Sequence, residues 1–477
     1  MIHRSSLRSL GAPAALLSLL GLGFMGPTTC FEPARPLSSP VHPASLSLNM
    51  KKSIATSDDG GVHATWHAVT HEGVAVFYAR SPDGGGDWEA PRRLSELGPI
   101  EPHPAIRASG RSVYVAWHAA GPDGQSVVFR RSIDGGTSFE APLALTTSGS
   151  AAHASLAAYG PNVQVVWADD RSGVSEVYVR SSVDGGQSFE PEQMLSDPLH
   201  ASWVPSVDAW GPVVVVAWVD YQDGNEEEYV RASRDAGSSW LPARRVTHHP
   251  ADSWAPSVAV RGETIFLGFF DRRAAGLLDG DVETVLDHAM AILGLPVVPA
   301  PPRDPAHYYL DDFHARISAK QHAIATRLPG FVAEGGDPTP VAALMEEFAR
   351  RMHAWSSGWG IFFVRSPDLG ASWEPVRPIA TPGGPALRPS LAVDGSDLHV
   401  VWFDGRHGDS EIYYRGSTDL GNRFGPEQRL TRSAADSLRP SVDAQDGRVH
   451  VLWTDARDGL PRIYAKRGRL LDAAGHE

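Results

Sequence analysis

A short turn motif, Ser-x-Asp-x-Gly-x-x-Trp/Phe, occurs six times in this chain at a nearly fixed interval. Successive copies are 51, 50, 51, 133 and 51 residues apart, and 133 is one period of 51 plus 82, so a single insertion interrupts a regular array. A repeat of about fifty residues with strand-like flanks indicates a solenoid or a propeller, because each repeat buries its apolar face against the next. These six Ser–Asp turns begin at Ser81, Ser132, Ser182, Ser233, Ser366 and Ser417.

Each repeat contains more than the turn. In the unit from Arg388 to Leu430, three β-like segments precede the Ser–Asp turn and a fourth follows it. Four antiparallel strands of this length make one propeller blade. An aromatic residue that ends the second strand recurs seven times, at Trp66, Trp117, Trp167, Trp218, Phe269, Trp402 and Trp453. We therefore predict an all-β, seven-bladed β-propeller, with a six-bladed ring as the alternative.

The seventh repeat stops after its third strand, and its missing fourth strand has a counterpart at the other end of the chain. Residues 31–39, FEPARPLSS, are similar to FEPEQMLSD at 189–197. We predict that 31–39 supplies the outer strand of the last blade and so removes an open sheet edge.

The insertion lies inside the fifth repeat, at 274–357, and separates blades 1 to 5 (31–273) from the rest of the ring (358–470). Its segments have the spacing of amphipathic helices, with proline-rich connectors between them. We expect a helical lid or a docking surface for a protein partner. Its polar cluster, whose spacing matches no familiar pair of metal ligands, is expected to be an exposed helix face. The cluster comprises His307, Asp311, Asp312, His314 and His322.

The N-terminus and the overall charge restrict the environment and the partners. Residues 1–29 have basic residues, an apolar stretch and then small residues, which is typical of an export signal. We expect export to the periplasm, the cell surface or the medium. The alternative is an exported lipoprotein, with the lipid attached to Cys30, the only cysteine. The formal net charge of −14 argues against nucleic acid as a partner.

The Ser–Asp turn resembles the Asp-box, or bacterial neuraminidase repeat, of the sialidase superfamily. The resemblance implies a propeller with its ligand site on the face opposite the turns, and a glycan or glycoconjugate as the ligand. That face receives the loops that join one blade to the next. Indoles there suit stacking on a sugar and guanidinium groups suit a carboxylate. The candidate substrate-binding residues in these loops are His103, His153, Trp203, Trp254, Arg388 and Arg439.

The resemblance also implies catalytic groups. The family's Arg-Ile-Pro motif is absent. Arg388 and Arg439 stand one residue later in their repeats, where strand alternation predicts the opposite orientation. For the acid, the matching loop positions are Asp123 and Asp409, and no tyrosine nucleophile can be singled out. The repeated Asp-x-Arg after the second strand, as in Asp169 and Arg171, is expected to tie loops together.

Two functions are consistent with these residues. The first is a glycoside hydrolase of the sialidase type, with Asp123 or Asp409 as the acid and the two arginines as the anion-binding groups. The second is a non-catalytic propeller that binds a glycan or a protein. We expect neither a cofactor nor a metal ion in either case.

Overall fold

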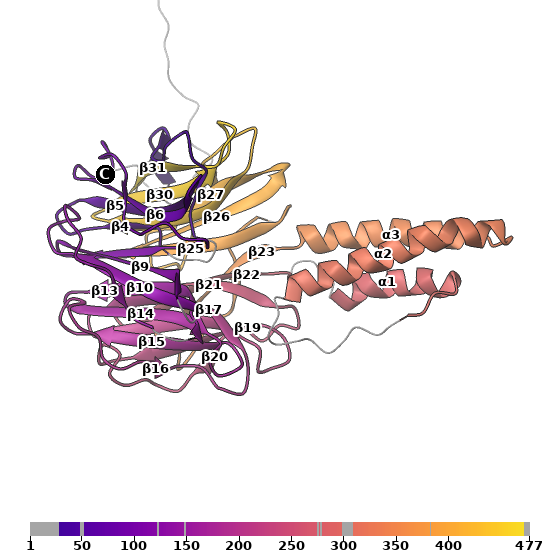
Figure 1. The fold of residues 1–477 in the computed structure, drawn as a ribbon, viewed down its shortest axis with the longest axis horizontal. Helices are drawn as coiled ribbons and strands as arrows, with labels where there is room; N and C mark the ends of the chain where they lie inside the picture. The colour runs from indigo at the N-terminus through magenta and orange to yellow at the C-terminus, as the bar shows by residue number, and fades with distance from the viewer. Residues whose placement is uncertain are drawn as a thin grey trace, which may run out of the picture.

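The computed structural model describes residues 28–471 except for 48–51, 122–123, 147–148, 274–275, 277–278, 298–308 and 382. Residues 1–27, which hold most of the predicted export signal, lie outside the described residues. The described residues form seven sheets, one for each repeat, and three helices. Their strands pair antiparallel, except that β10 and β12 pair parallel. The first strands of consecutive blades contact one another, and β29 contacts β4, so the sheets close into one ring. Figure 1 shows the sheets packed one beside the next. The prediction of a seven-bladed propeller is confirmed.

The first four blades follow the chain in order. Blade 1 consists of β3 (Ala44–Ser45), β4 (Ile54–Thr56), β5 (Val62–Thr70), β6 (Gly73–Ser81) and β7 (Arg92–Arg93). Blade 2 consists of β8 (Ala105–Ser109), β9 (Ser112–Gly121), β10 (Gly124–Ser132), β11 (Leu143–Ala144) and β12 (Gly149–Ser150). Blade 3 consists of β13 (Ala152–Tyr159), β14 (Asn162–Asp169), β15 (Glu176–Ser182) and β16 (Gln193–Met194). Blade 4 consists of β17 (Ser202–Trp210), β18 (Val213–Asp220), β19 (Glu227–Ser233) and β20 (Arg244–Arg245).

The last three blades complete the ring. Blade 5 consists of β21 (Ser253–Arg261), β22 (Thr264–Asp271), β23 (Gly360–Ser366) and β24 (Arg377–Pro378). Blade 6 consists of β25 (Ala386–Asp394), β26 (Asp397–His407), β27 (Asp409–Ser417) and β28 (Gln428–Arg429). Blade 7 joins β29 (Ser437–Gln445), β30 (Arg448–Asp455) and β31 (Arg462–Leu471) to two N-terminal strands, β1 (Thr28–Phe31) and β2 (Arg35–Pro36).

The two ends of the chain meet in blade 7. Both β1 and β2 pair antiparallel with β31, with Thr29 opposite Leu470 and Arg35 opposite Ala465. The Thr29 side chain is buried and its hydroxyl donates a hydrogen bond of 2.8 Å to the Tyr414 hydroxyl in blade 6. The predicted closure of the ring by an N-terminal strand is therefore confirmed, and the strand begins at Thr28, before the predicted 31–39.

The core lies between the blades. The recurrent tryptophans at the end of the second strands are buried. All of them except Trp117, which faces Val128, stack on the aromatic ring opposite them in the third strand. The ring centroids of Trp402 and Tyr413, for example, are 5.9 Å apart with an interplanar angle of 19°. Burial of an indole removes a large apolar area from water, so one tryptophan per repeat supplies much of the adhesion between blades.

The Ser–Asp turns are held by local hydrogen bonds. In the second copy, the Ser132 hydroxyl donates to Asp134 Oδ1 at 2.7 Å and accepts from the Gly136 amide at 2.9 Å. Gly136 has a φ of +76°, which a residue with a Cβ atom resists. The turns are thus structural elements that connect the third and fourth strands of their blades.

The helices α1 (Asp279–Ile292), α2 (Tyr309–Ala333) and α3 (Thr339–Ser357) lie between β22 and β23 of blade 5. They pack on one another around a hydrophobic cluster that contains no residue of the ring, and Figure 1 shows them extending away from it. Their function as a lid stays a prediction. No helix in the described part of the chain is long and apolar enough to cross a membrane.

Candidate functional site

The first strand of each blade runs from one end of the ring to the other, which separates two faces. At its start lie the inter-blade loops, and we call this end the mouth face. At its finish lies a hairpin against which a Ser–Asp turn packs: the Leu420 amide of a turn donates to the Ser396 carbonyl of a hairpin at 2.8 Å. We call this end the turn face. The candidate residues of the inter-blade loops therefore lie on the face opposite the turns.

A β-bulge recurs near the start of the first strand in blades 3 to 7. Arg388 and Arg439 both have a φ of +56°, and the register shifts between Leu387 and Ser390 and between Leu438 and Ser441. Two residues of the first strand therefore face one residue of the second, and the alternation of side chains is interrupted there. Simple alternation therefore does not determine the orientation of Arg388 and Arg439, and their part in binding stays a prediction.

These two arginines and Glu101 form an electrostatic group on the mouth face. The Arg439 guanidinium donates to the Ser45 hydroxyl and, at 3.4 Å, to the Leu46 carbonyl. Burial lowers the pKa of Arg439, the charge of Arg388 lowers it further, and the charge of Glu101 acts in the opposite direction. Arg439 thus lies within electrostatic range of one like charge, Arg388, and one opposite charge, Glu101.

Three histidines adjoin this group. The rings of His67 and His103 are 5.4 Å apart, and those of His103 and His118 are also 5.4 Å apart. The Glu101 Oε2 atom lies 3.5 Å from His67 Nε2 and 3.7 Å from His103 Nε2. Burial, and next the charge of Arg439, lowers the pKa of His67 to about 4. His67 is therefore neutral at physiological pH, and its ring can take part in hydrogen bonding without adding charge.

Sequence reasoning had named His103 but not His67, His118 or Glu101. A signal was nevertheless present. In blades 3 to 7 an aspartate stands two residues after the recurrent aromatic residue, whereas blades 1 and 2 have Ala68 and Ala119 there and a histidine directly after the tryptophan. The histidine group occupies the part of the ring in which the Asp-x-Arg pattern is missing.

The other candidate residues are less closely associated. Trp254 is 2% exposed and packs in the core between blades 5 and 6, so its face is covered. His153 and Trp203 are half-buried at the starts of the first strands β13 and β17, in blades 3 and 4. Asp409 is exposed at the tip of the hairpin between β26 and β27. Asp123 lies outside the described residues.

The Asp-x-Arg pairs are local, as expected. Arg171, Arg273, Arg406 and Arg457 each contact the aspartate two residues before them. The guanidinium groups also lie over aromatic rings of the third strand, as Arg406 does over Tyr413 at 4.6 Å. Each arginine thus secures its own loop, and this set carries no site.

The cation-binding capacity of the described side chains is also limited. No group of three or more His, Cys, Asp or Glu side chains is arranged to hold a metal ion among the residues that the structure covers. In the polar cluster of the insertion, His307 and the side chains of Asp311, Asp312 and His314 are outside this part of the chain.

No protein-family model matches the sequence, and no curated protein does. Among solved structures, a polysaccharide lyase of family PL25, an ulvan lyase bound to -[GlcA(1-4)Rha3S]-, is similar with a TM-score of 0.53 and 10% identity, over 90% of this chain and 95% of the lyase. The phage phi92 endosialidase has a TM-score of 0.47 and 10% identity over 94% of this chain and 70% of its own. A Trypanosoma rangeli sialidase has a TM-score of 0.41 and 11% identity over 92% of this chain and 59% of its own. The similarity to the lyase extends over nearly the whole of both chains and shows that they share a fold.

Proposed function

We propose that this protein acts on glycans that carry a carboxylate, and that it binds them at the mouth face. The observation that carries the proposal is the group of Arg388, Arg439 and Glu101. Each arginine disfavours the charge of its neighbour, and a bound carboxylate would relieve that repulsion. Arginine also offers two parallel donors that match the geometry of a carboxylate.

The fold comparison supports the same substrate class. The lyase with a TM-score above one half is named for a polysaccharide with glucuronic acid in its repeat. A uronate or a sialate presents one carboxylate on a hydroxyl-rich ring. The half-buried indole of Trp203 and the imidazole of His153, at the starts of the first strands of blades 4 and 3 on the same face, suit the ring of a sugar.

For the reaction, the proposal is hydrolysis of a glycosidic bond by a protein of the sialidase type. Asp409 and Asp123 are the acids to test, because both belong to loops between second and third strands. The second candidate function is binding without catalysis. The observation that favours it is the position of Asp409, exposed at a hairpin tip rather than within the Arg388, Arg439 and Glu101 group.

The test combines turnover with binding. Purified protein is assayed on aryl glycosides, sialosides included, and on uronate polysaccharides, while calorimetry measures the affinity for the free acidic sugars. Loss of one charge-assisted hydrogen bond costs about 1.5–3 kcal/mol, so Arg388→Ala and Arg439→Ala should each weaken binding about 10- to 100-fold. Arg423→Ala, an exposed arginine on a Ser–Asp turn, is the matched control and should bind like the wild type.

The outcomes separate the candidate functions. Turnover that disappears in Asp409→Asn or Asp123→Asn would establish the hydrolase and its acid. Binding that depends on both arginines, without turnover, would establish the binding function. Unchanged affinity in both arginine variants would exclude the mouth face as the site of anion recognition.

We also propose that the protein is exported. The support is the composition of residues 1–29, with basic residues ahead of an apolar stretch. Because Thr28 and Thr29 pair with β31, export that preserves the ring would require cleavage before Thr28. Lipid attachment at Cys30 would instead remove these two residues from the strand.

A further inference from the structure

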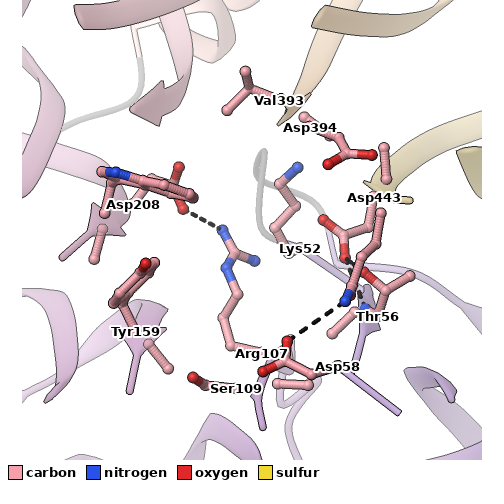
Figure 2. Close-up of a pocket in the computed structure, with 18 of the residues that line it drawn as sticks. Lys52, Thr56, Asp58, Arg107, Ser109, Tyr159, Asp208, Val393, Asp394 and Asp443 are labelled. Atoms are coloured by element: carbon pink, nitrogen blue, oxygen red, sulfur yellow. Dashed lines mark hydrogen bonds and ion pairs between the residues drawn. The ribbon is translucent and has the colours of Figure 1, made fainter. Parts of the chain in front are cut away.

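The turn face holds a cavity that the proposed function does not use. Its volume is about 730 Å³, and its walls come from the first strands and hairpins of the ring. A cavity of this size fits a ligand of one to a few sugar rings, because small-molecule sites span about 300–1,000 Å³. Figure 2 shows Lys52, Arg107, Asp208 and Asp443 gathered in it.

These charged side chains break the repeat. One position of the first strand is alanine in four blades, at Ala55, Ala157, Ala259 and Ala392. In blades 2, 4 and 7 the same position holds Arg107, Asp208 and Asp443. Lys52 stands three residues before this position in blade 1, where the other blades have proline or alanine. Four repeats show that the strand folds with alanine at that position, so the fold does not require a charge there.

The four groups form two loosely coupled pairs. Arg107 Nη2 lies 3.6 Å from Asp208 Oδ1, beyond the length of a good hydrogen bond. The Lys52 ammonium donates to the carbonyls of Leu391 and Val442, the latter at 2.7 Å. Asp443 Oδ2 accepts from the Thr56 amide and hydroxyl, both at 2.8 Å. Burial lowers the pKa of Lys52 to about 8 and raises the pKa of Asp208.

The balance of charge restricts the class of ligand. Two cations and two anions lie at the centre, and the whole lining holds four basic and five acidic side chains. An anion or a cation would gain little net attraction from such a lining. A neutral polyhydroxylated ligand fits better, since each hydroxyl both donates and accepts and can bridge a carboxylate and a guanidinium.

The rim adds an aromatic surface. Tyr159 is 38% exposed and its ring contacts that of Trp210 edge to face, at 5.0 Å between centroids. The Arg261 guanidinium lies 3.6 Å from the centre of the Trp210 ring and covers that face. Tyr159 therefore offers the accessible ring, and Figure 2 shows it beside Arg107 and Asp208. An aromatic ring next to paired donors and acceptors is the arrangement that sugars need.

We propose that this cavity is a second binding site, specific for neutral sugars, on the turn face of the ring and therefore opposite the mouth face. It goes beyond the proposed function, because it uses none of the mouth-face residues and does not require catalysis. The site would hold a neutral part of a glycan, while an acidic part of the same or another chain is bound at the mouth face.

The experiment is saturation-transfer difference NMR on the full folded chain. The probes are the methyl glycosides of glucose, galactose and mannose, with cellobiose and lactose, and the charged controls are glucuronic acid and glucosamine. We expect saturable binding of at least one neutral probe. Tyr159→Ala should weaken it about fivefold, the size of one aromatic contact, and Tyr159→Phe should stay within about twofold.

Two further variants keep the test decisive. Arg107→Ala combined with Asp208→Ala removes one cation and one anion together, mimics the alanine of the other blades, and should abolish the signal. Arg388→Ala, on the mouth face, should leave it unchanged. The proposal is overturned by the absence of binding for every neutral probe, by a preference for a charged control, or by binding that depends on Arg388 and not on Tyr159.

Discussion

Glu228 places a carboxyl group in an apolar layer between blades 4 and 5. It is fully buried in β19, and neither of its carboxyl oxygens has a hydrogen-bond partner within the described residues. The positions that match it in the other six third strands are also fully buried and are Val76, Val127, Val177, Ile361, Ile412 and Ile463. Burial, followed by the charges of Glu227 and Asp271, raises the pKa of Glu228 well above 4.5.

We predict that Glu228→Ile stabilises the protein. An unpartnered buried polar group costs about 1–3 kcal/mol, so the free energy of unfolding should rise by about that amount at pH 4. The gain should then grow with pH. The folded protein retains the proton that the unfolded chain loses above pH 4.5, so the contribution of Glu228 to stability falls by about 1.4 kcal/mol per pH unit until its folded pKa is reached.

The assay is urea unfolding, followed by tryptophan fluorescence and circular dichroism, between pH 4 and pH 8. Glu228→Gln is the matched control, since it keeps the shape and the polar atoms but cannot titrate. It should remain close to the wild type at pH 4 and become more stable than it as the pH rises. A stability difference between Glu228→Ile and the wild type that does not change with pH, or a loss of stability in Glu228→Ile, would refute the reasoning.

Two other perturbations test the architecture. Asp271 pairs directly with Gly360, so replacement of 274–357 by a short glycine-rich turn should leave a ring that still unfolds cooperatively in calorimetry. The free energy of unfolding should fall by about 0.5–1 kcal/mol, because the contact of Arg272 with Trp355 is lost. A chain that no longer folds would contradict this prediction. Intact-mass analysis of protein isolated from its native host should show a chain that begins at or before Thr28. A lipid-modified N-terminus at Cys30 would contradict this prediction. Removal of 28–31 should lower the free energy of unfolding by about 2–4 kcal/mol, because the hydrogen bonds of β1 are lost.

The number of blades could be predicted from the sequence because the residues that define a blade recur. Trp402 and Trp453 are buried for the same reason in two different blades, so spacing alone locates both. The closing strand could be predicted as well, since the seventh repeat lacks a segment that every other repeat has. The arrangement of the insertion could not, because helical spacing specifies which face of each helix is apolar but not where the bundle projects.

The site was predicted less completely than the fold. Arg388 and Arg439 were identified as residues of inter-blade loops, but their orientation depends on a bulge with positive φ. Neither residue is glycine, so the local sequence gives no sign of that conformation. His67 and Glu101 were missed because their proximity results from the packing of blade 1 on blade 2, which no spacing within one repeat expresses.

The residues proposed to bind ligands on the mouth face and on the turn face share one property. In a ring built from repeats, a residue that serves the fold can occur in every blade, as the recurrent tryptophans do. A residue that serves a ligand is needed only where the ligand lies. His67 and His118 at the mouth face, and Arg107 and Asp208 at the turn face, each stand where other blades have an ordinary strand residue. We therefore expect function at the departures from the repeat, and alanine variants at those positions should be well tolerated by the ring.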